Sequence, residues 1–322
     1  MRKLFILTML AAALTSNAHA QVYPSHPITM VVPLPAGGAF DVTARILAEH
    51  MRGSLGQPVI IENVTGAAGS IGTGQVARAA PDGYTLIFGG LNTHVVNPAF
   101  LSLQYDVLKD FEPIALTATV QLLIVAKKAM PANDLKELIA WLKANPDKAS
   151  QGTGGRGNTS HLAAVFFQKE TGTHLAFVPY RGAGAAINDL VAGHIDIMID
   201  LAPNSLPHVR AGTIKAYAVT ASNRLAVAPE IPTVDEAGLP GFHMRIWQAI
   251  WAPKGTPAAV VAKLNAAIVA ALGDPTVRSR LADLGQEVFP PEQLTPEALS
   301  AFNKAEIEKW WPIIEAAHIK PE

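Results

Sequence analysis

Short runs of apolar, β-branched residues alternate along the chain with segments in which apolar residues recur every three or four positions. The short runs predict strands, and the longer periodic segments predict amphipathic helices. The predicted strands are residues 28–32, 58–62, 84–88, 122–126, 175–180, 195–200 and 215–220. Because strands and helices alternate, we expect an α/β fold built on mainly parallel sheets.

The first long helix follows strand 28–32 and a turn rich in proline and glycine. Apolar residues at spacings of four, three, four and four give this helix one apolar face: Phe40, Ala44, Leu47, Met51 and Leu55. Free backbone N–H groups and the positive end of the helix point into such a strand–turn–helix junction. The turn is therefore a candidate anion site.

Other helices have readable start and stop signals. Leucines between Leu135 and Leu142 predict a helix that ends at Asn145, just before a proline. Three later helices are predicted to begin at a capping side chain followed by proline, at Thr256, Asp274 and Thr295. Roughly the last sixty residues show helical patterns only, so we expect them to pack outside a completed sheet.

The N-terminus has the pattern of a secretory signal peptide. Arg2 and Lys3 precede an apolar segment, residues 4–14, and the small-x-small sequence around His19 matches a cleavage site before Gln21. The chain has no cysteine, which excludes disulfides, thiolate nucleophiles and cysteine-based metal sites. We therefore expect residues 1–20 to be removed on export and the protein to reside in a bacterial periplasm.

Composition narrows the class further. Hydrophobic residues make up 49% and charged residues 16% of the chain, and the formal net charge is −1. These values favour a well-packed globule of two domains, which we expect to be a monomer. No basic block is present, so nucleic acid is not an expected partner.

The pattern of an enzyme is weak. Gly152, Gly154 and Gly157 match a dinucleotide fingerprint, but residues 147–151 do not make a convincing buried strand before it. A phosphate loop is excluded because Asn158 stands where a lysine is needed.

Other catalytic signatures are missing from the sequence. No nucleophile-elbow motif is present, and the histidines are scattered without the spacing of a helix-borne zinc site. Asp196 and Asp200 share a strand face, but nothing else marks an acid–base pair. We therefore expect no catalytic residue, no metal site and no cofactor.

Glycine-rich turns recur where predicted strands end, at residues 35–41, 66–72, 152–160 and 181–185. Open α/β sheets bind ligands at the carboxyl ends of their strands. Several such turns meeting at one edge make a stronger site prediction than any single turn.

Seven segments follow in the order and spacing of a known family: VPLPAGGAFDVTARILAEHM, LGQPVIIENVTGAAGSIG, VARAAPDGYTLIFGG, HVVNPAF, FVPYRGAGAAINDLVAGHIDIMID, PEIPTVDEAGLPGF and WAPKGTPAAVVAKLNAAI. With them the chain resembles the extracytoplasmic solute-binding proteins of tripartite tricarboxylate transporters, also called Bug proteins. The resemblance covers essentially all of the chain after the signal peptide.

The resemblance implies a two-lobed flytrap fold of periplasmic binding proteins, with two Rossmann-like lobes joined by two crossing strands. Residues 21–120 and 247–322 would form lobe 1, and residues 121–246 would form lobe 2. The ligand would be a small organic carboxylate, most simply a dicarboxylate, held between the lobes. Its partners would be the membrane permease subunits of an ion-gradient-driven tripartite tricarboxylate transporter.

The resemblance also implies two site walls, each formed by a turn that leads into a helix. The first wall comprises Pro35, Ala36, Gly37, Gly38, Ala39, Phe40 and Asp41. The second comprises Gly155, Gly157, Asn158, Thr159, Ser160 and His161. Further candidate ligand-binding residues are Asn92, Tyr180, Arg181 and Asp200.

Several first-wall residues have two interpretations. Gly37 and Gly38 either bring backbone close to a ligand or satisfy a turn that needs positive φ. Phe40 either lines the ligand or belongs to the helix core. Asp41 either meets a polar ligand group or sits favourably in a first helical turn, and we expect it to bind loop N–H groups. After Asn63 the family often has an arginine, which this chain lacks.

Candidates elsewhere also have two interpretations. Arg181 either clamps a carboxylate or is a solvated loop cation, and Asp200 either faces the ligand or caps the next helix. We expect Trp247 and Trp251 to pack at the hinge. The function favoured is delivery of the ligand to a permease; the alternative is ligand presentation to a membrane sensor kinase, and hydrolysis by a secreted enzyme ranks below both.

Overall fold

The computed structural model describes residues 23–155 and 158–316. The predicted signal peptide and Gly157 lie outside these ranges. Within them no single helix is long and apolar enough to cross a membrane, although one bent helix pair, Ala258–Gly273 with Pro275–Asp283, meets the length and composition criteria together.

The first lobe is built on three parallel strands. Strand β1 (Ile28–Val32) lies between β2 (Val59–Asn63) and β3 (Thr85–Gly90). Helix α2 (Ala39–Leu55) follows β1, and α3 (Ser70–Ala77) follows β2. The residues predicted to form the apolar face of α2 are all buried, which confirms that stripe.

The second lobe repeats this plan. Strand β5 (Ser150–Thr153) lies between β6 (Ala176–Pro179) and β7 (Ile197–Leu201), again in parallel. The prediction that the residues before Gly152 form no strand is therefore wrong. The helices of this lobe are α5 (Leu135–Ala144), α6 (Thr159–Thr171), α7 (Ala183–Ala192) and α8 (Ala202–Arg210).

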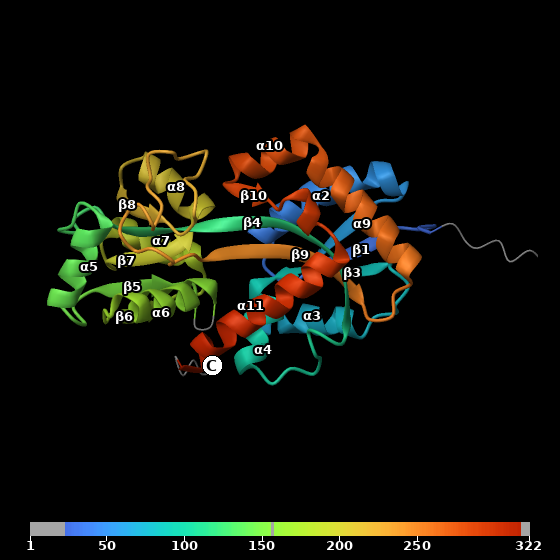
Figure 1. The fold of residues 1–322 in the computed structure, drawn as a ribbon, viewed down its shortest axis with the longest axis horizontal. Coiled ribbons are helices and arrows are strands. Elements are labelled where there is room, and N and C mark those ends of the chain that lie inside the picture. The colour runs from blue at the N-terminus through green and yellow to red at the C-terminus, as the bar shows by residue number, and fades with distance from the viewer. Residues whose placement is uncertain (1–22, 156–157, 317–322) are drawn as a thin grey trace, which may run out of the picture.

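Two long antiparallel strands join the lobes, as Figure 1 shows. Strand β4 (Phe111–Lys127) pairs with β9 (Arg245–Pro253) over its first part and with β7 and β8 (Ile214–Val219) over its second part. Strand β9 also pairs with β3 of the first lobe. This arrangement is the two-lobed flytrap architecture that was predicted.

The C-terminal segment packs on the first lobe. It contains α9 (Ala258–Gly273), α10 (Pro275–Asp283), β10 (Gln286–Val288) and α11 (Pro296–Ala316). Strand β10 pairs antiparallel with β4, so the prediction of helices only in this segment is wrong.

Short connecting elements complete the fold. A 3-10 turn, η1 (Ala67–Gly69), precedes α3. A π-helical turn, η2 (Asn92–Val96), and α4 (Asn97–Phe100) follow β3. A second 3-10 turn, η3 (Pro291–Gln293), lies between β10 and α11.

Two of the three predicted caps are confirmed. The Asp274 carboxylate accepts hydrogen bonds from N–H groups at the start of α10, and the Thr295 hydroxyl accepts from Ala298 at the start of α11. Thr256 is not a cap, because its hydroxyl instead donates to the carbonyl of Pro253.

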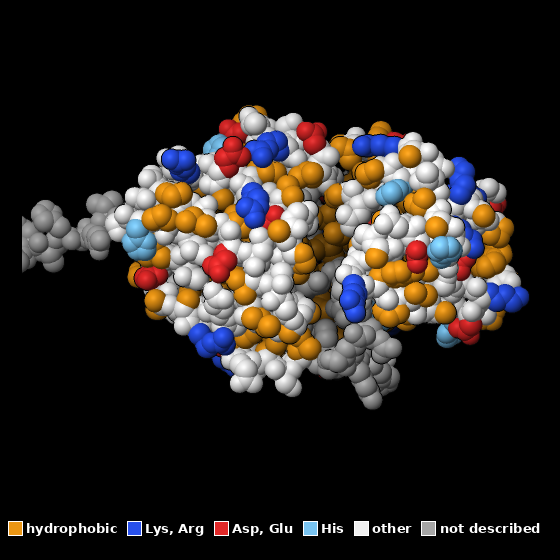
Figure 2. All heavy atoms as spheres, turned by 180° about the vertical axis from the view of Figure 1, so that it is seen from behind, with side chains coloured by type: hydrophobic (Ala, Val, Ile, Leu, Met, Phe, Trp, Pro, Cys, Tyr) orange, Lys and Arg blue, Asp and Glu red, His pale blue; other side chains and the backbone are white. Residues whose placement is uncertain are grey.

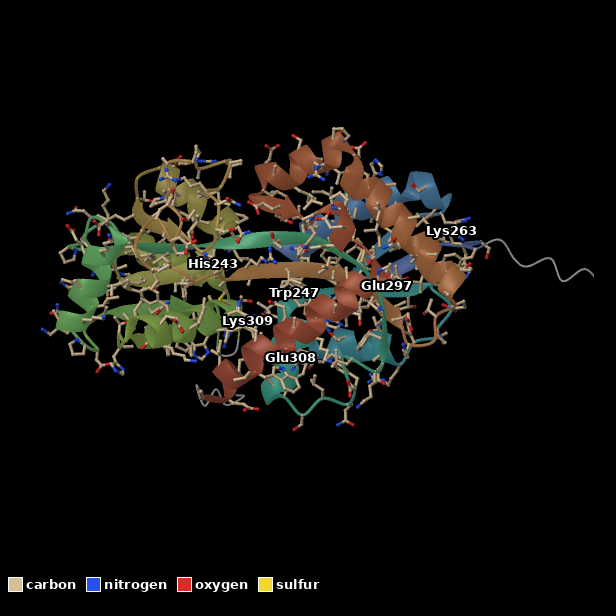
Figure 3. The ribbon with its side chains drawn as sticks, viewed as in Figure 1. His243, Trp247, Lys263, Glu297, Glu308 and Lys309 are labelled. Carbon is tan, nitrogen blue, oxygen red and sulfur yellow. The ribbon has the colours of Figure 1, made fainter. Side chains whose placement is uncertain are left out.

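Aromatic residues connect the lobes on the side of α11. Phe166 of α6 packs against Phe242 and Trp310, with ring centroids 4.9 and 5.4 Å apart. Trp247 and Trp251 of β9 are buried, as predicted for the hinge. Figure 3 shows Trp247 on β9 close to α11, with Lys309 of α11 reaching toward His243, whose carbonyl it contacts at 3.4 Å.

Candidate functional site

The carboxyl ends of the parallel strands of both lobes face the junction between the lobes, where Figure 2 shows a groove. A cavity of about 110 Å³ lies at this junction, and we call it the front cavity. It receives one residue from the first lobe and seven from β4 and the second lobe. Its lining residues are Asn92, Leu122, Asn158, Thr159, Ser160, Ala183, Asp200 and Leu201.

A hydrogen bond across this junction ties the lobes together. The Thr159 hydroxyl, at the start of α6, donates to the Asn92 side-chain oxygen over 2.6 Å. Asn92 opens the π-helical turn that follows β3. The two predicted residues therefore meet directly although 67 positions separate them.

The turn of the first wall lies at the surface. Residues Pro35 to Gly38 are exposed, Ala39 is half-buried, and the lining of the front cavity includes none of residues 35–41. Gly37 has φ +80°, whereas Gly38 has φ −76°. The positive-φ interpretation is therefore right for Gly37 and wrong for Gly38, which forms the N-cap of α2.

Asp41 holds this turn in shape. Its carboxylate accepts the Gly37 N–H over 2.8 Å and the Asn63 amide over 2.9 Å, and it is ion-paired with Arg45 at 2.9 Å. Burial alone would raise the pKa of Asp41, but hydrogen bonds from Arg45, Gly37 and Asn63 lower it below the ordinary value. The prediction that Asp41 binds loop N–H groups is confirmed.

Arg45 also contacts the Asn63 side-chain oxygen, over 3.0 Å. A cation therefore stands beside Asn63 although the sequence lacks the arginine expected after it. An i, i+4 pair on α2 supplies it, a spacing that places Asp41 and Arg45 on one helix face.

Phe40 belongs to the core and not to the cavity lining. It is 7% exposed and meets Phe88 edge to face, with centroids 5.9 Å apart. Of its two interpretations the core packing is the one observed.

The second wall is organised by the cap of α6. The Asn158 side-chain oxygen accepts the His161 N–H and the Ser160 hydroxyl, and the Ser160 oxygen accepts the Gly154 N–H. These bonds fix the start of α6 toward the cavity. Gly155, at φ +120°, adopts a conformation that favours glycine.

Two candidates from the next turn do not line the front cavity. The Tyr180 hydroxyl donates to Asp189 over 2.6 Å, and burial together with this bond raises the pKa of Tyr180 to about 12. Arg181 is exposed. The turn that contains them contributes Ala183 to the lining instead.

Among the described residues, Asp200 is the one acidic side chain that lines the front cavity, and it is 2% exposed. The Ser205 hydroxyl donates to it over 3.1 Å and the Asn204 amide over 3.4 Å. Burial raises the pKa of Asp200 to about 6, against the opposing effects of the Leu201 N–H and of these two side chains. Asp200 therefore lines the cavity and also interacts with the first turn of α8.

Sequence reasoning missed the apolar part of the lining. Leu122, Ala183 and Leu201 carry no chemical signature: Ala183 begins α7, Leu201 ends β7, and Leu122 lies within β4. The exposed turn at Ala67 and Ala68, both at positive φ, was singled out only as glycine-rich. Gly69 of this turn packs against Pro33, which places it beside the first wall.

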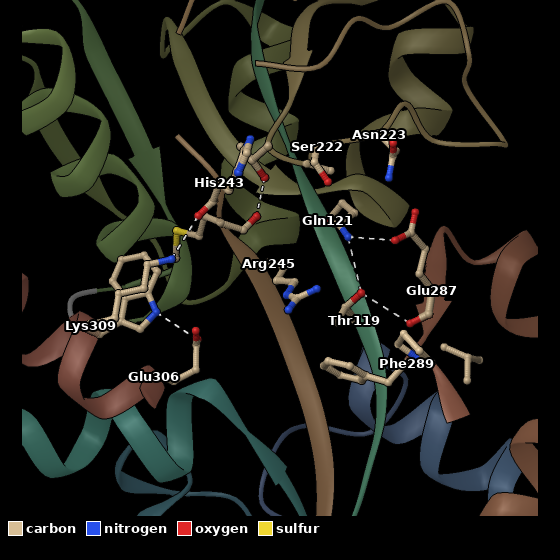
Figure 4. A pocket seen from close by; sticks show the side chains of 16 residues that line it. Thr119, Gln121, Ser222, Asn223, His243, Arg245, Glu287, Phe289, Glu306 and Lys309 are labelled. Atoms are coloured by element: carbon tan, nitrogen blue, oxygen red, sulfur yellow. Dashed lines mark hydrogen bonds between the residues drawn. The ribbon is translucent and has the colours of Figure 1, made fainter. Parts of the chain in front are cut away.

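A larger cavity, about 480 Å³, lies on the other side of β4, and we call it the rear cavity. Thr119 and Gln121 line the rear cavity, whereas Leu122 lines the front one, because successive side chains of a strand alternate in direction. Figure 4 shows its polar groups bonded to one another, with Gln121 donating to Glu287.

Other groups of the rear cavity also have partners. Glu306 accepts the indole N–H groups of Trp247 and Trp310 over 3.0 and 3.1 Å. The Arg245 guanidinium lies over the rings of Phe289 and Phe302. Within residues 23–155 and 158–316 no cluster of three or more histidine or acidic residues is placed to hold a metal ion.

Comparison with known proteins shows the family to which this chain belongs. Residues 43–319 match the family described as the tripartite tricarboxylate transporter family receptor, TctC. The periplasmic binding protein BugD is 40% identical, with a TM-score of 0.81 over 93% of this chain and 100% of its own.

Two similar structures contain ligands. MatC from Rhodopseudomonas palustris, solved with bound malate, is 40% identical with a TM-score of 0.81, over 91% of this chain and all of its own. A second R. palustris protein, solved with adipate, is 32% identical with a TM-score of 0.83, over 93% of this chain and all of its own.

Proposed function

Because this chain belongs to the TctC receptor family of tripartite tricarboxylate transporters, we propose that it captures a small dicarboxylate in the periplasm and delivers it to membrane permease subunits. Residues 1–20 would direct its export. The protein acts as a monomer and needs no cofactor in this proposal.

The observation that supports the proposal best is a pair of helix starts, one on each lobe, where each helix is the next element after a parallel strand. The backbone turn before α2 lies on the first lobe, and the capped start of α6 lies on the second. Free N–H groups and the positive helix ends favour carboxylates at both places. A ligand with a carboxylate at each end would contact both lobes.

Contact with both lobes also explains how the ligand controls closure. A ligand shifts a conformational equilibrium only if it binds one state better than the other. We propose that β4 and β9 form the hinge between residues 21–120 with 247–322 and residues 121–246. A dicarboxylate would then favour the closed state, in which Thr159 and Asn92 meet.

The proposal gains support from the relatives. Malate and adipate, the ligands in the two similar structures, are both dicarboxylates. Their different lengths leave the ligand of this chain open within that class.

A melting-temperature series tests the proposal. The mature chain is heated with C4–C8 dicarboxylates, monocarboxylates of equal length, sugars and amines. At a ligand concentration about a thousandfold above the dissociation constant, the native state gains about 4 kcal/mol. We expect a shift of several degrees for one or more dicarboxylates and much less for the matched monocarboxylates. Equal shifts for both classes, or a shift with sugars or amines alone, would contradict it.

A further inference from the structure

Asp200 places a carboxylate inside a site that we assign to an anionic ligand. It lies on β7 opposite Leu123 of β4, is 2% exposed and lines the front cavity. Its negative charge repels a ligand carboxylate placed next to it. The group that meets Asp200 must therefore be of another kind.

The chain itself leaves part of the Asp200 carboxylate unused. Ser205 donates to one oxygen over 3.1 Å and Asn204 to the other over 3.4 Å, both from α8, and the Leu201 backbone N–H is a third donor. An ionised carboxylate accepts about four hydrogen bonds. The charge of His208 also favours its ionised form. The three donors within the described residues leave about one acceptor position for a group on the ligand.

The other polar groups of the front cavity do not occupy that position. The Thr159 hydroxyl donates to Asn92, and the Ser160 hydroxyl donates to Asn158. The side chains of Asn92 and Asn158 also carry amide donors, but the side-chain donors bonded to Asp200 within the described residues are those of Asn204 and Ser205. Leu122, Ala183 and Leu201 have no side-chain donor.

We propose that Asp200 determines ligand specificity by accepting a hydrogen bond from a hydroxyl or ammonium group on the ligand. The ligand class is then a dicarboxylate substituted with a hydroxyl or amino group next to one carboxylate. This inference rests on the proposed function and names the substrate class of the same site. A buried acceptor discriminates strongly against an analogue that lacks the donor, because the acceptor then has no partner.

Isothermal titration calorimetry on the mature chain tests this with two ligands of nearly equal shape, (S)-malate and 2-methylsuccinate. Malate carries a hydroxyl group at the position where 2-methylsuccinate carries a methyl group. L-aspartate and succinate extend the series. We expect malate and aspartate to bind about 10-fold or more tighter than 2-methylsuccinate, the range of a hydrogen bond to a charged group.

Asp200→Asn removes the charge and keeps the shape. We expect the preference for malate over 2-methylsuccinate to fall to within about 3-fold, chiefly because the methyl and unsubstituted ligands bind more tightly. Asp106→Asn is the matched control, since Asp106 lies in a surface turn paired with Lys109, and we expect it to keep the full preference.

The outcomes separate the two proposals. Equal affinity of the unaltered chain for malate and 2-methylsuccinate would overturn the assignment of Asp200, whether or not the variant folds, and would leave the proposed function standing. An unchanged preference in a folded Asp200→Asn protein would also overturn it. Binding of no dicarboxylate at all would contradict the proposed function and this inference with it.

Discussion

The front and rear cavities lie on opposite sides of β4 and differ in more than size. The rear cavity is about 480 Å³ and the front one about 110 Å³. Yet the strand ends and the start of α6 meet at the front, and the lobes are bonded there through Thr159 and Asn92. Cavity volume alone would select the side of β4 opposite to the site that we propose.

The polar groups of the two cavities are also used differently. At the rear, Glu306 binds two indoles and Gln121 binds Glu287, so these groups stabilise the fold. At the front, Asp200 stays buried with two neutral side-chain donors. Within the described residues the rear also holds a buried atom without a hydrogen-bond partner, the Gln121 Oε1, so the distinction of the front is a buried acid whose pKa burial raises.

The largest expected difference between the cavities comes from an added negative charge. Ala183→Asp places an acid in the front cavity at the start of α7, where the helix itself tolerates it. We expect ligand affinity to fall by about 1000-fold, since like charges about 4 Å apart cost about 4 kcal/mol at an effective dielectric of 20. Isothermal titration calorimetry with the tightest-binding dicarboxylate measures this loss of affinity.

Ser222→Asp is the matched variant, because Ser222 lines the rear cavity and is exposed. We expect its ligand affinity to stay within about 3-fold of the unaltered chain, given the screening of exposed charges. A larger loss with Ser222→Asp than with Ala183→Asp would reverse the assignment of front and rear.

The second effect concerns how much the ionised, buried Asp200 carboxylate lowers the free energy of unfolding. Its pKa in the folded protein is about 6, against an ordinary value of 3.8. The native state therefore binds this proton more strongly than the unfolded state does. Stability falls as the pH rises between these two values and stays lower above them. Asp200→Asn, which does not titrate, removes this loss.

We expect the stability advantage of Asp200→Asn over the unaltered chain to grow by about 2 kcal/mol between pH 4 and pH 7, since each pKa unit is worth about 1.4 kcal/mol and the unfolded carboxyl is already partly ionised at pH 4. Urea unfolding without ligand measures it at both pH values. An advantage that is constant across this range, or that shrinks, would show that Asp200 is not a buried, unneutralised acid.

The third effect is confined to the rear cavity. Glu306→Gln weakens the charge-assisted bonds to Trp247 and Trp310, so we expect a loss of about 1–2 kcal/mol in the free energy of unfolding. Ligand preference should not change. Glu308→Gln, on an exposed position of the same helix, is the control and should leave stability nearly unaffected. A change in ligand preference with Glu306→Gln alone would give the rear cavity a role in recognition.

The smallest effect tests the bond between the lobes. Thr159→Val keeps the shape and removes the hydroxyl that donates to Asn92. Losing about 1 kcal/mol from the closed state weakens apparent ligand affinity by about 5-fold. Thr119→Val, in the rear cavity, should not weaken binding. If both variants bind alike, the bond between Thr159 and Asn92 contributes nothing to closure.

The sequence predicted features formed by residues that are close together along the chain, and it missed contacts between distant residues. The first wall was readable because its parts are local. The stripe on α2 and the role of Asp41 follow from residues within one or two helical turns. The contact between Thr159 and Asn92 was not readable, because only the folded lobes bring those two residues together.

The missed strands have a physical explanation. In β5, residues Gln151, Gly152 and Thr153 are polar or lack a side chain, yet all three are buried. Strand β5 is buried because it lies between β6 and β7, and no hydrophobic pattern in the sequence indicates this burial. Strand β10 has only three residues, too few for a period to appear. Gly38 showed that a glycine-rich turn does not assign positive φ to each glycine.

The central claim is that one ligand bridges both lobes at the front cavity. Because the chain has no cysteine, spin labels can be attached at Gln75→Cys on α3 and Lys169→Cys on α6, both exposed. Pulsed electron paramagnetic resonance then measures the distance between the lobes. We predict that a tightly binding dicarboxylate shortens and narrows this distance, whereas a monocarboxylate of equal length leaves it unchanged. An unchanged distance with a saturating dicarboxylate, or the same shortening with both ligands, would contradict the account.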